Sequence, residues 1–113
     1  MIDFSKIKTY PISQRKNLVT LNDLISPEAP PPPFDNPDLR EVAERIVEAR
    51  KKGRPVIWMM GAHVIKSGLS LIVIDLMKKG IITHVASNGA VTIHDFEIAL
   101  IGETSEDVAT SIE

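Results

Sequence analysis

Cysteine is absent from this chain of 113 residues. That absence excludes disulfide bonds, thiolate metal sites and cysteine nucleophiles. It also fits a reducing compartment, where disulfides are rare. We therefore expect a cytoplasmic protein.

An excess of charge of one sign is also absent. The chain carries 13 basic and 15 acidic side chains, which give a formal net charge of −2. No global field would therefore attract nucleic acid or an anionic membrane. Residues 1–8 are mixed rather than basic and then apolar, so they do not form a signal peptide. No apolar run approaches the roughly 20 residues that span a bilayer. We expect a soluble protein with neither nucleic acid nor membrane as a partner.

Proline divides the chain into two parts. The four consecutive prolines at residues 30–33 fix φ and remove backbone donors, which favours an extended connector outside any helix or sheet. Such a stretch is more typical of a stiff spacer than of a ligand for a proline-binding module. Residues 1–35 are therefore predicted to form an arm, with one short strand at most, and a proline-rich linker. Residues 36–113 are predicted to form an α/β segment.

Apolar periodicity predicts the elements of this segment. Asn36 followed by Pro37 is typical of a helix start and Gly53 of a helix end, so a helix is expected over residues 37–52. The apolar runs and helical repeats that follow predict two buried parallel strands, over 56–60 and 81–86. Between them, a helix from Gly68 to Gly80 is apolar nearly all round, so it is expected to lie in the interior or to be buried against another subunit. A third helix is predicted over 91–100, and residues 104–107 are predicted to cap a fourth.

This order of elements predicts an α/β fold with a parallel sheet. Two strand–helix units supply only two parallel strands, whereas such sheets are stable when several strands are covered on both faces. Something else must therefore complete the core. We expect this chain to be part of a longer protein, or to associate with copies of itself or with another polypeptide.

The first strand-to-helix junction offers candidate ligand contacts. In open α/β sheets, ligands bind beyond the carboxyl ends of the strands, where free amides and the helix dipole attract anions. Gly61 and Gly68 are seven residues apart. This spacing matches neither the glycine pattern of the dinucleotide-binding fingerprint nor that of a P-loop. Lys66 could bind a phosphate or a carboxylate, or be a solvated loop lysine. Ser67 could contact a ligand or cap the next helix. His63 lies just past the strand end, where ligands bind.

The second junction carries more polar groups. Asn88 and Gly89 predict a left-handed or otherwise unusual turn that exposes backbone amides, and Asn88 could recognise a ribose, an amide or a carboxylate. His94, Asp95 and Glu97 lie on the first turns of an otherwise apolar helix. We predict His94 and Asp95 to be catalytic, as proton-handling or orienting groups, because histidine relays protons near neutral pH. Alternatively, Asp95 only favours the positive end of the helix.

No metal site is predicted. His94 and Glu97 form one i,i+3 pair, and no second matching motif exists in the chain. His84 lies inside the second predicted strand and is expected to be a satisfied interior histidine.

Both junctions resemble the cofactor-binding region of deoxyhypusine synthase and its bacterial relatives. Residues 61–68 are similar to that family's Ser-Asn-Leu-Ile-Ser-Ser-Gly loop, and residues 87–95 to its Thr-Thr-Ala-Gly-Gly loop and the acidic residues after it. In the first loop a histidine replaces the family's asparagine and a lysine replaces a serine. In the second, Ser87 and Asn88 replace threonines. A more distant resemblance is to the archaeal-type ornithine cyclodeaminases, which have an Asn-Ala-x-x-x-His-Asp turn after the second strand.

The resemblance implies a three-layer, Rossmann-like parallel sheet of the deoxyhypusine-synthase-like NAD-binding type, incomplete in this chain. It implies NAD as the cofactor, and Asp95 near the ribose or the substrate. The family forms tetramers with cofactor sites at subunit interfaces, which implies a homo-oligomer. The residues that would bind the cofactor are Gly61, Ala62, His63, Lys66, Ser67, Asn88, Gly89 and Ala90.

We therefore predict part of a deoxyhypusine-synthase-like protein that binds a nicotinamide dinucleotide or a related small-molecule ligand. The parent chemistry would be NAD-assisted transformation of an amine substrate. The nucleophilic lysine and the polyamine-binding acids of deoxyhypusine synthase fall beyond this sequence, so this chain alone is not expected to form deoxyhypusine. Two alternatives stay open: an interaction module that mediates assembly and binds no ligand, and a fragment of an ornithine-cyclodeaminase-like enzyme.

Overall fold

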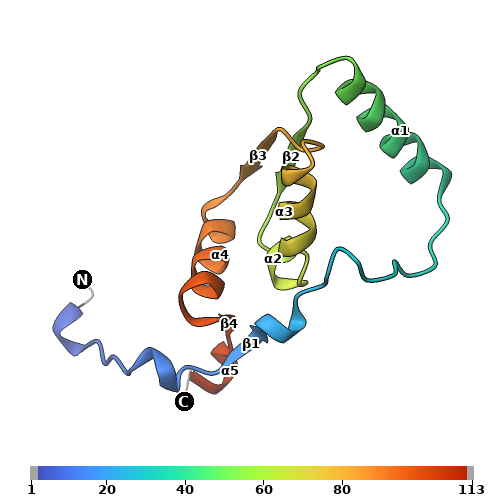
Figure 1. Ribbon diagram of the computed structural model, residues 1–113. Helices are drawn as coiled ribbons and strands as arrows, with labels where there is room; N and C mark the ends of the chain where they lie inside the picture. The colour runs from blue at the N-terminus through green and yellow to red at the C-terminus, as the bar shows by residue number, and fades with distance from the viewer. Residues whose placement is uncertain (1–2, 112–113) are drawn as a thin grey trace.

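The computed structural model describes residues 3–111, in which helices and strands alternate along the second half of the chain (Figure 1). The α-helices are α1 (Pro37–Lys51), α2 (His63–Lys66), α3 (Ser70–Lys78), α4 (Gly89–Ile101) and α5 (Val108–Ser111). The strands are β1 (Asn17–Thr20), β2 (Ile57–Met60), β3 (His84–Ser87) and β4 (Glu103–Glu106). Three 3-10 helices lie in the arm, namely η1 (Phe4–Lys6), η2 (Ile12–Gln14) and η3 (Leu21–Asp23). Within the described residues, none of the helices combines the length and the apolar character needed to cross a membrane.

Most predicted elements are present. The helix predicted over 37–52, the strand over 56–60 and the helix over 91–100 are confirmed to within two residues at each end. The second strand begins three residues later than predicted, and the loop predicted over 61–68 contains the short helix α2. His84 opens β3 instead of lying inside it and is exposed, so the prediction of an interior histidine is wrong.

β2 and β3 form a parallel pair, which confirms the α/β class. The register places Trp58 opposite Val85 and Met60 opposite Ser87. Because side chains alternate along a strand, these four residues share one face of the sheet. Met60, Val85 and Ser87 line a cavity together with side chains of α3 and α4, so both helices lie over this face.

The opposite face of the sheet is uncovered. Ile57 and Met59 point to it by strand alternation and are 59% and 81% exposed. The prediction that the strand over 56–60 is buried is therefore wrong for one of its faces within residues 3–111, because α3 and α4 both lie on the other side of the sheet. For α3, the prediction of an interior helix is wrong within residues 3–111, whereas burial against another subunit stays a prediction. Val73 is buried, whereas Ile74 and Met77 are exposed.

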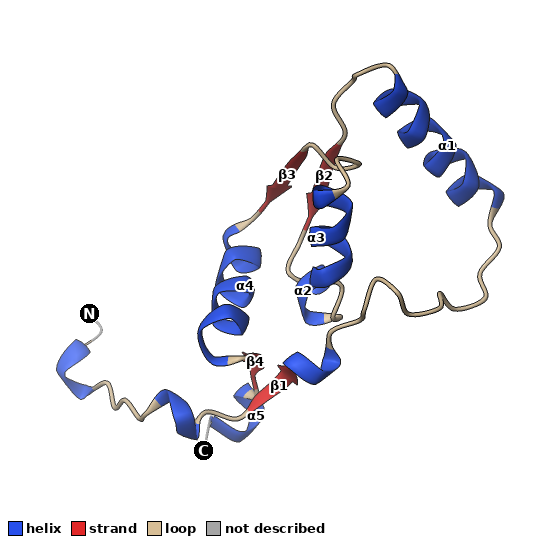
Figure 2. Ribbon diagram, viewed as in Figure 1, coloured by secondary structure: helices blue, strands red, loops and turns tan. Residues whose placement is uncertain are grey.

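A second, antiparallel pair of strands joins the arm to the C-terminal part of the chain (Figure 2). β1 pairs with β4, with Val19 opposite Thr104, and the Asp107 N–H donates to the Lys16 carbonyl at 2.8 Å. The short strand predicted in the arm is therefore confirmed. The prediction that residues 104–107 cap a helix is wrong for 104–106, because the arm supplies a strand that satisfies their backbone groups. A helix does begin after Asp107.

α1 begins where local sequence dictates. The Asn36 side chain accepts a hydrogen bond from the Asp38 N–H at 2.8 Å, and Pro37 occupies the first position of the helix. At the other end, Arg50 Nε donates to the Gly80 carbonyl at 2.7 Å, which anchors the helix beside the turn after α3. These contacts fix both ends of α1 without burying its apolar side.

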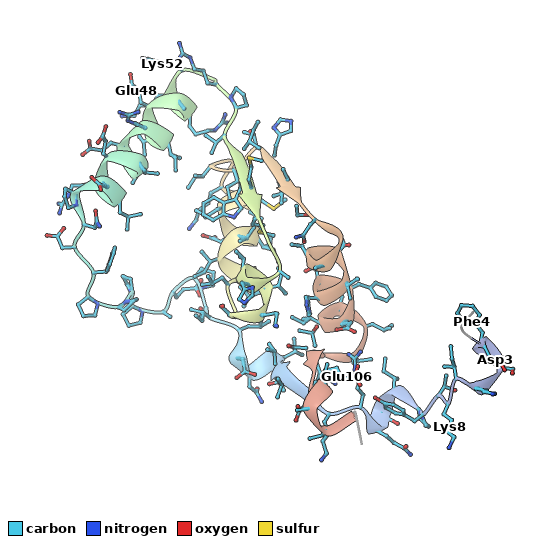
Figure 3. All side chains as sticks on the ribbon, turned by 180° about the vertical axis from the view of Figure 1, so that it is seen from behind. Asp3, Phe4, Lys8, Glu48, Lys52 and Glu106 are labelled. Atoms are coloured by element: carbon cyan, nitrogen blue, oxygen red, sulfur yellow. The ribbon has the colours of Figure 1, made fainter. Side chains whose placement is uncertain are left out.

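The rest of α1 stands apart from both sheets (Figure 1). None of its residues is buried, and the apolar side chains of Leu39, Val42 and Val47 are all exposed. Figure 3 shows Glu48 and Lys52, an ion pair, near the C-terminal end of α1. The radius of gyration is 18.3 Å, whereas a compact chain of this length has about 13 Å. The chain thus presents an unusually large apolar surface for its size.

Gly68 holds the arm against the first strand-to-helix junction. Its φ is +78°, and a Cβ there would lie 2.1 Å from the carbonyl oxygen of Asp23. Its own carbonyl accepts a hydrogen bond from the Ile25 N–H at 2.8 Å. A residue with a side chain would therefore be strained and would push the arm away.

Gly68→Ala is expected to lower the free energy of unfolding by about 2–4 kcal/mol, because the left-handed backbone and the clash with Asp23 both disfavour alanine. Chemical denaturation measures the change. Gly61→Ala is the matched control, since a Cβ at Gly61 meets no atom within 4 Å. The control should change stability by less than about 0.5 kcal/mol. Similar losses in both variants would contradict this role of Gly68.

Candidate functional site

The two strand-to-helix junctions converge on one cavity. Because β2 and β3 are parallel, their carboxyl ends lie at the same edge of the sheet. The cavity there has a volume of about 460 Å³ and opens to solvent. Three consecutive residues from each junction line it: Met59, Met60, Gly61, Ala86, Ser87 and Asn88. We call this the strand-end cavity. Of the residues predicted to bind a cofactor, it brings together Gly61 and Asn88.

Asn88 forms the N-cap of α4. Its φ of −96° and ψ of 170° are extended, and its side-chain oxygen accepts a hydrogen bond from the Val91 N–H at 3.4 Å. The predicted left-handed turn at Asn88-Gly89 is wrong, because Asn88 is extended and Gly89 already begins the helix, with no positive φ. Gly89 and Ala90 are exposed in the first turn, where backbone N–H groups have no partner within the helix. The positive end of α4 therefore lies beside the strand-end cavity.

The remaining residues of the first junction lie in the short helix α2 or directly beside it. Ala62 precedes this helix, exposed His63 begins it and half-buried Lys66 ends it. Ser67 follows as the C-cap of α2. The prediction that Ser67 caps the next helix is wrong, because Leu69 occupies the N-cap position of α3. None of these four residues lines the strand-end cavity, although α2 packs against α4.

His94 and Asp95 point to different surroundings. Neighbouring residues of a helix are turned by about 100° from each other. Asp95 is exposed and lines the cavity between α3 and α4, together with Ser87 and Thr92. His94 instead approaches β4, where its Nδ1 lies 2.7 Å from Thr104 Oγ1. The structure therefore does not bring the two predicted catalytic residues into one site.

A chain of polar groups links His94 to the arm. Thr104 Oγ1 donates to Glu97 Oε2 at 2.5 Å, and Arg15 donates to Glu97 Oε1 at 2.6 Å. Since the Thr104 hydroxyl proton is used on Glu97, the Thr104 oxygen accepts from His94. The Nδ1 of His94 therefore carries a proton, and in the neutral ring Nε2 keeps the lone pair. We call these four residues the relay cluster.

The charges of the relay cluster stabilise one another. The hydrogen bond from Arg15 lowers the pKa of Glu97, as does the hydrogen bond from Thr104, while burial opposes both. The hydrogen bond to Glu97 likewise raises the pKa of Arg15. The side chains of Arg15 and Glu97 are 14% and 19% exposed, so solvent screens this pair less than the ion pairs of α1. Glu97 therefore stays ionised in the folded protein at neutral pH.

Arg15, Thr104 and Ser70 belong to polar sites that the sequence did not reveal. Arg15 and Thr104 lie far from α4 in the sequence, and no local pattern pairs them with it. Ser70 is 7% exposed, and its hydroxyl has no hydrogen-bond partner in the described chain. The only signal for Ser70 is a serine in the first turn of an apolar helix, which is also typical of ordinary helix starts. No group of three or more His, Asp or Glu residues within 3–111 is placed to hold a metal ion.

Comparison with known families places this chain in a Rossmann-fold family. A family model described as "Arginine dihydrolase ArgZ-like, C-terminal, Rossmann fold" matches residues 40–111. Searches of curated proteins and of solved structures gave no match. The family match confirms the predicted Rossmann-like fold, and it names a different family from deoxyhypusine synthase. It spans both junctions and most of the chain. The chain therefore belongs to the arginine dihydrolase ArgZ-like family, within the part that forms the C-terminal Rossmann fold.

Proposed function

We propose that this chain binds NAD or a related dinucleotide in the strand-end cavity. The observation that carries the proposal is the convergence of two strand-to-helix junctions on a single open cavity. Ligands of open α/β sheets bind at this edge. Membership of a Rossmann-fold family supports the same location. The family name includes an arginine dihydrolase, but the match concerns the Rossmann fold, so arginine hydrolysis is not part of the proposal.

The residues of the strand-end cavity suit a dinucleotide. All six lining residues are uncharged, so no carboxylate among them opposes a pyrophosphate. The first turn of α4 offers N–H groups and a positive dipole end to the phosphates. Gly61 lets the ligand approach the backbone, because nothing lies within 4 Å of the position of a Cβ. Met59, which is exposed, offers an apolar surface to a ring.

The parent chemistry that we propose is NAD-assisted transformation of an amine, as in deoxyhypusine-synthase-like proteins. Bound NAD would supply a hydride acceptor. In this chain His94 is the candidate base, because the relay cluster holds its proton on Nδ1 and leaves Nε2 free to accept one. Asp95 is a separate candidate that could orient a cationic group. Since the two side chains diverge and neither lines the strand-end cavity, His94 and Asp95 are separate candidates and not one catalytic pair.

We propose further that a larger assembly completes the sheet, either copies of this chain or additional polypeptide of the same protein. Ile57 and Met59 leave one face of the sheet apolar and exposed, and α1 exposes an apolar side of its own. Exposed apolar patches of this kind mark surfaces that other protein covers. A binding site at the edge of the sheet would gain further walls from the same assembly.

Calorimetric titration with NAD, combined with light scattering for the oligomeric state, tests the proposal. We expect saturable binding at one site per chain. His63→Ala should change the affinity little, because His63 is exposed and does not line the strand-end cavity. A sample of defined size that binds no NAD would overturn the proposal and favour the interaction module without a ligand.

A further inference from the structure

A second cavity lies on the helix-covered face of the sheet, between α3 and α4. It has a volume of about 330 Å³. Its walls are mostly apolar and come from both strands and three helices; they include Ile65, Val73, Ile74, Met77 and Val91. Met60 and Ser87 line both this cavity and the strand-end cavity, so the two are neighbours. We call the second one the interhelical cavity.

Ser70 gives the interhelical cavity a buried polar group that lacks a partner. Ser70 is 7% exposed and lines the cavity, and its Oγ has no hydrogen-bond partner within the described chain. A buried hydroxyl without a partner is costly, because it has given up its hydrogen bonds to water. A ligand that presents a neutral hydrogen-bonding group to Ser70 would remove that cost.

Asp95 gives the same cavity one negative charge. It is exposed, and no other residue that lines the cavity is charged. Asp75 is close in sequence to Met77, which lines the cavity. Asp75 itself pairs with Lys79 and does not line the cavity, so it adds no charge there. Asp95 would repel a carboxylate or a phosphate and attract an ammonium group.

We propose that the interhelical cavity binds a short aliphatic amino alcohol, or a ligand of the same chemistry. The ammonium group pairs with Asp95, the methylene chain contacts the apolar walls, and the hydroxyl bonds to Ser70 Oγ. No covalent step is involved. The proposal does not depend on NAD binding, since the strand-end cavity supplies none of the polar contacts.

Titration of methyl-labelled protein with 5-aminopentan-1-ol, followed by NMR, tests the proposal. Homologues one methylene shorter and one methylene longer show which chain length fits best. We expect saturable shifts confined to the methyl groups that line the cavity, which include those of Ile65, Val73, Ile74, Val85 and Val91. Three reference ligands separate the contacts. Pentylammonium lacks the hydroxyl, pentan-1-ol lacks the charge, and 5-hydroxypentanoate reverses it. The amino alcohol should bind most tightly and the carboxylate least.

Two substitutions assign the polar ends. Asp95→Asn should weaken the amino alcohol about 5-fold and leave pentan-1-ol unchanged, because an exposed carboxylate is partly screened. Asp75→Asn, on the facing helix, is the matched control and should have no effect. Ser70→Ala should remove the advantage of the amino alcohol over pentylammonium, about 3- to 10-fold. In the absence of ligand, Ser70→Ala should raise the Tm, because the substitution removes a buried hydroxyl that has no hydrogen-bond partner.

Several results would overturn the proposal. Shifts that do not saturate, or that spread beyond the cavity, would mean that the probes bind nonspecifically. Equal effects of Asp95→Asn and Asp75→Asn would remove Asp95 from the site. If light scattering shows a stable oligomer whose cavity methyl groups respond to no probe, protein rather than a small ligand fills the cavity.

Discussion

Asn88→Asp is expected to weaken NAD binding by about 10- to 100-fold while the fold stays intact. Asparagine and aspartate are equally good N-caps, and a negative charge at the first turn of α4 interacts favourably with the positive end of the helix dipole. The stability of the protein should therefore be unchanged or slightly higher. The same charge lines the strand-end cavity, where it would repel the pyrophosphate. Calorimetric titration gives the affinity, and chemical denaturation gives the stability.

Two further variants isolate the effect of charge. Asn36→Asp makes the same exchange at the N-cap of α1, which is remote from the strand-end cavity, and should leave the affinity unchanged. Asn88→Ser keeps a neutral cap and should cost less than about 5-fold. Raising the salt concentration should reduce the loss in Asn88→Asp, because salt screens an exposed charge. If Asn88→Asp binds NAD as tightly as the unmodified chain, the phosphates do not lie at α4.

The parts of the fold that local sequence determines were predictable. α1 follows from Asn36, Pro37 and an apolar repeat, all of which lie within the helix or next to it. The two parallel strands follow from apolar runs, and their common edge follows from the requirement that strand–helix units wind in one direction. For this reason Gly61 and Asn88 could be placed together from the sequence alone.

The parts that depend on distant segments were not predictable. Residues 103–106 become a strand only because the arm pairs with them, and on local grounds their polar residues are typical of a helix cap. Arg15 and Glu97 are 82 residues apart, and no periodicity connects them. At the first junction, the four-residue helix α2 is too short to produce a periodic signal, so His63 and Lys66 were placed in a loop although they lie in a helix.

Glu97→Gln is expected to lower the free energy of unfolding by about 2–3 kcal/mol near neutral pH. The substitution keeps the shape of the side chain but removes the charge that Arg15 binds. Arg15 Nε and Nη2 are already buried without hydrogen-bond partners in the described chain, so the guanidinium would lose its hydrogen-bonded counter-charge. Chemical denaturation of both proteins across a range of pH measures the difference.

The pH dependence distinguishes this charge pair from simple packing. The ordinary pKa of a glutamate is 4.5, and Arg15 lowers the pKa of Glu97 in the folded chain below that value. Above 4.5 the stabilisation by the pair is complete. As the pH falls further, the unfolded chain binds a proton before the folded chain does, so the stabilisation is lost as the pH passes through the folded pKa. The advantage of the unmodified chain over Glu97→Gln should therefore shrink in acid.

Glu41→Gln is the control, because it breaks an exposed ion pair with Arg45 on α1, and it should lower the free energy of unfolding by only about 0.3–0.5 kcal/mol. If the difference in unfolding free energy between Glu97→Gln and the unmodified chain stays constant down to strongly acidic pH, the loss comes from packing. The charge of Glu97 would then not stabilise the relay cluster.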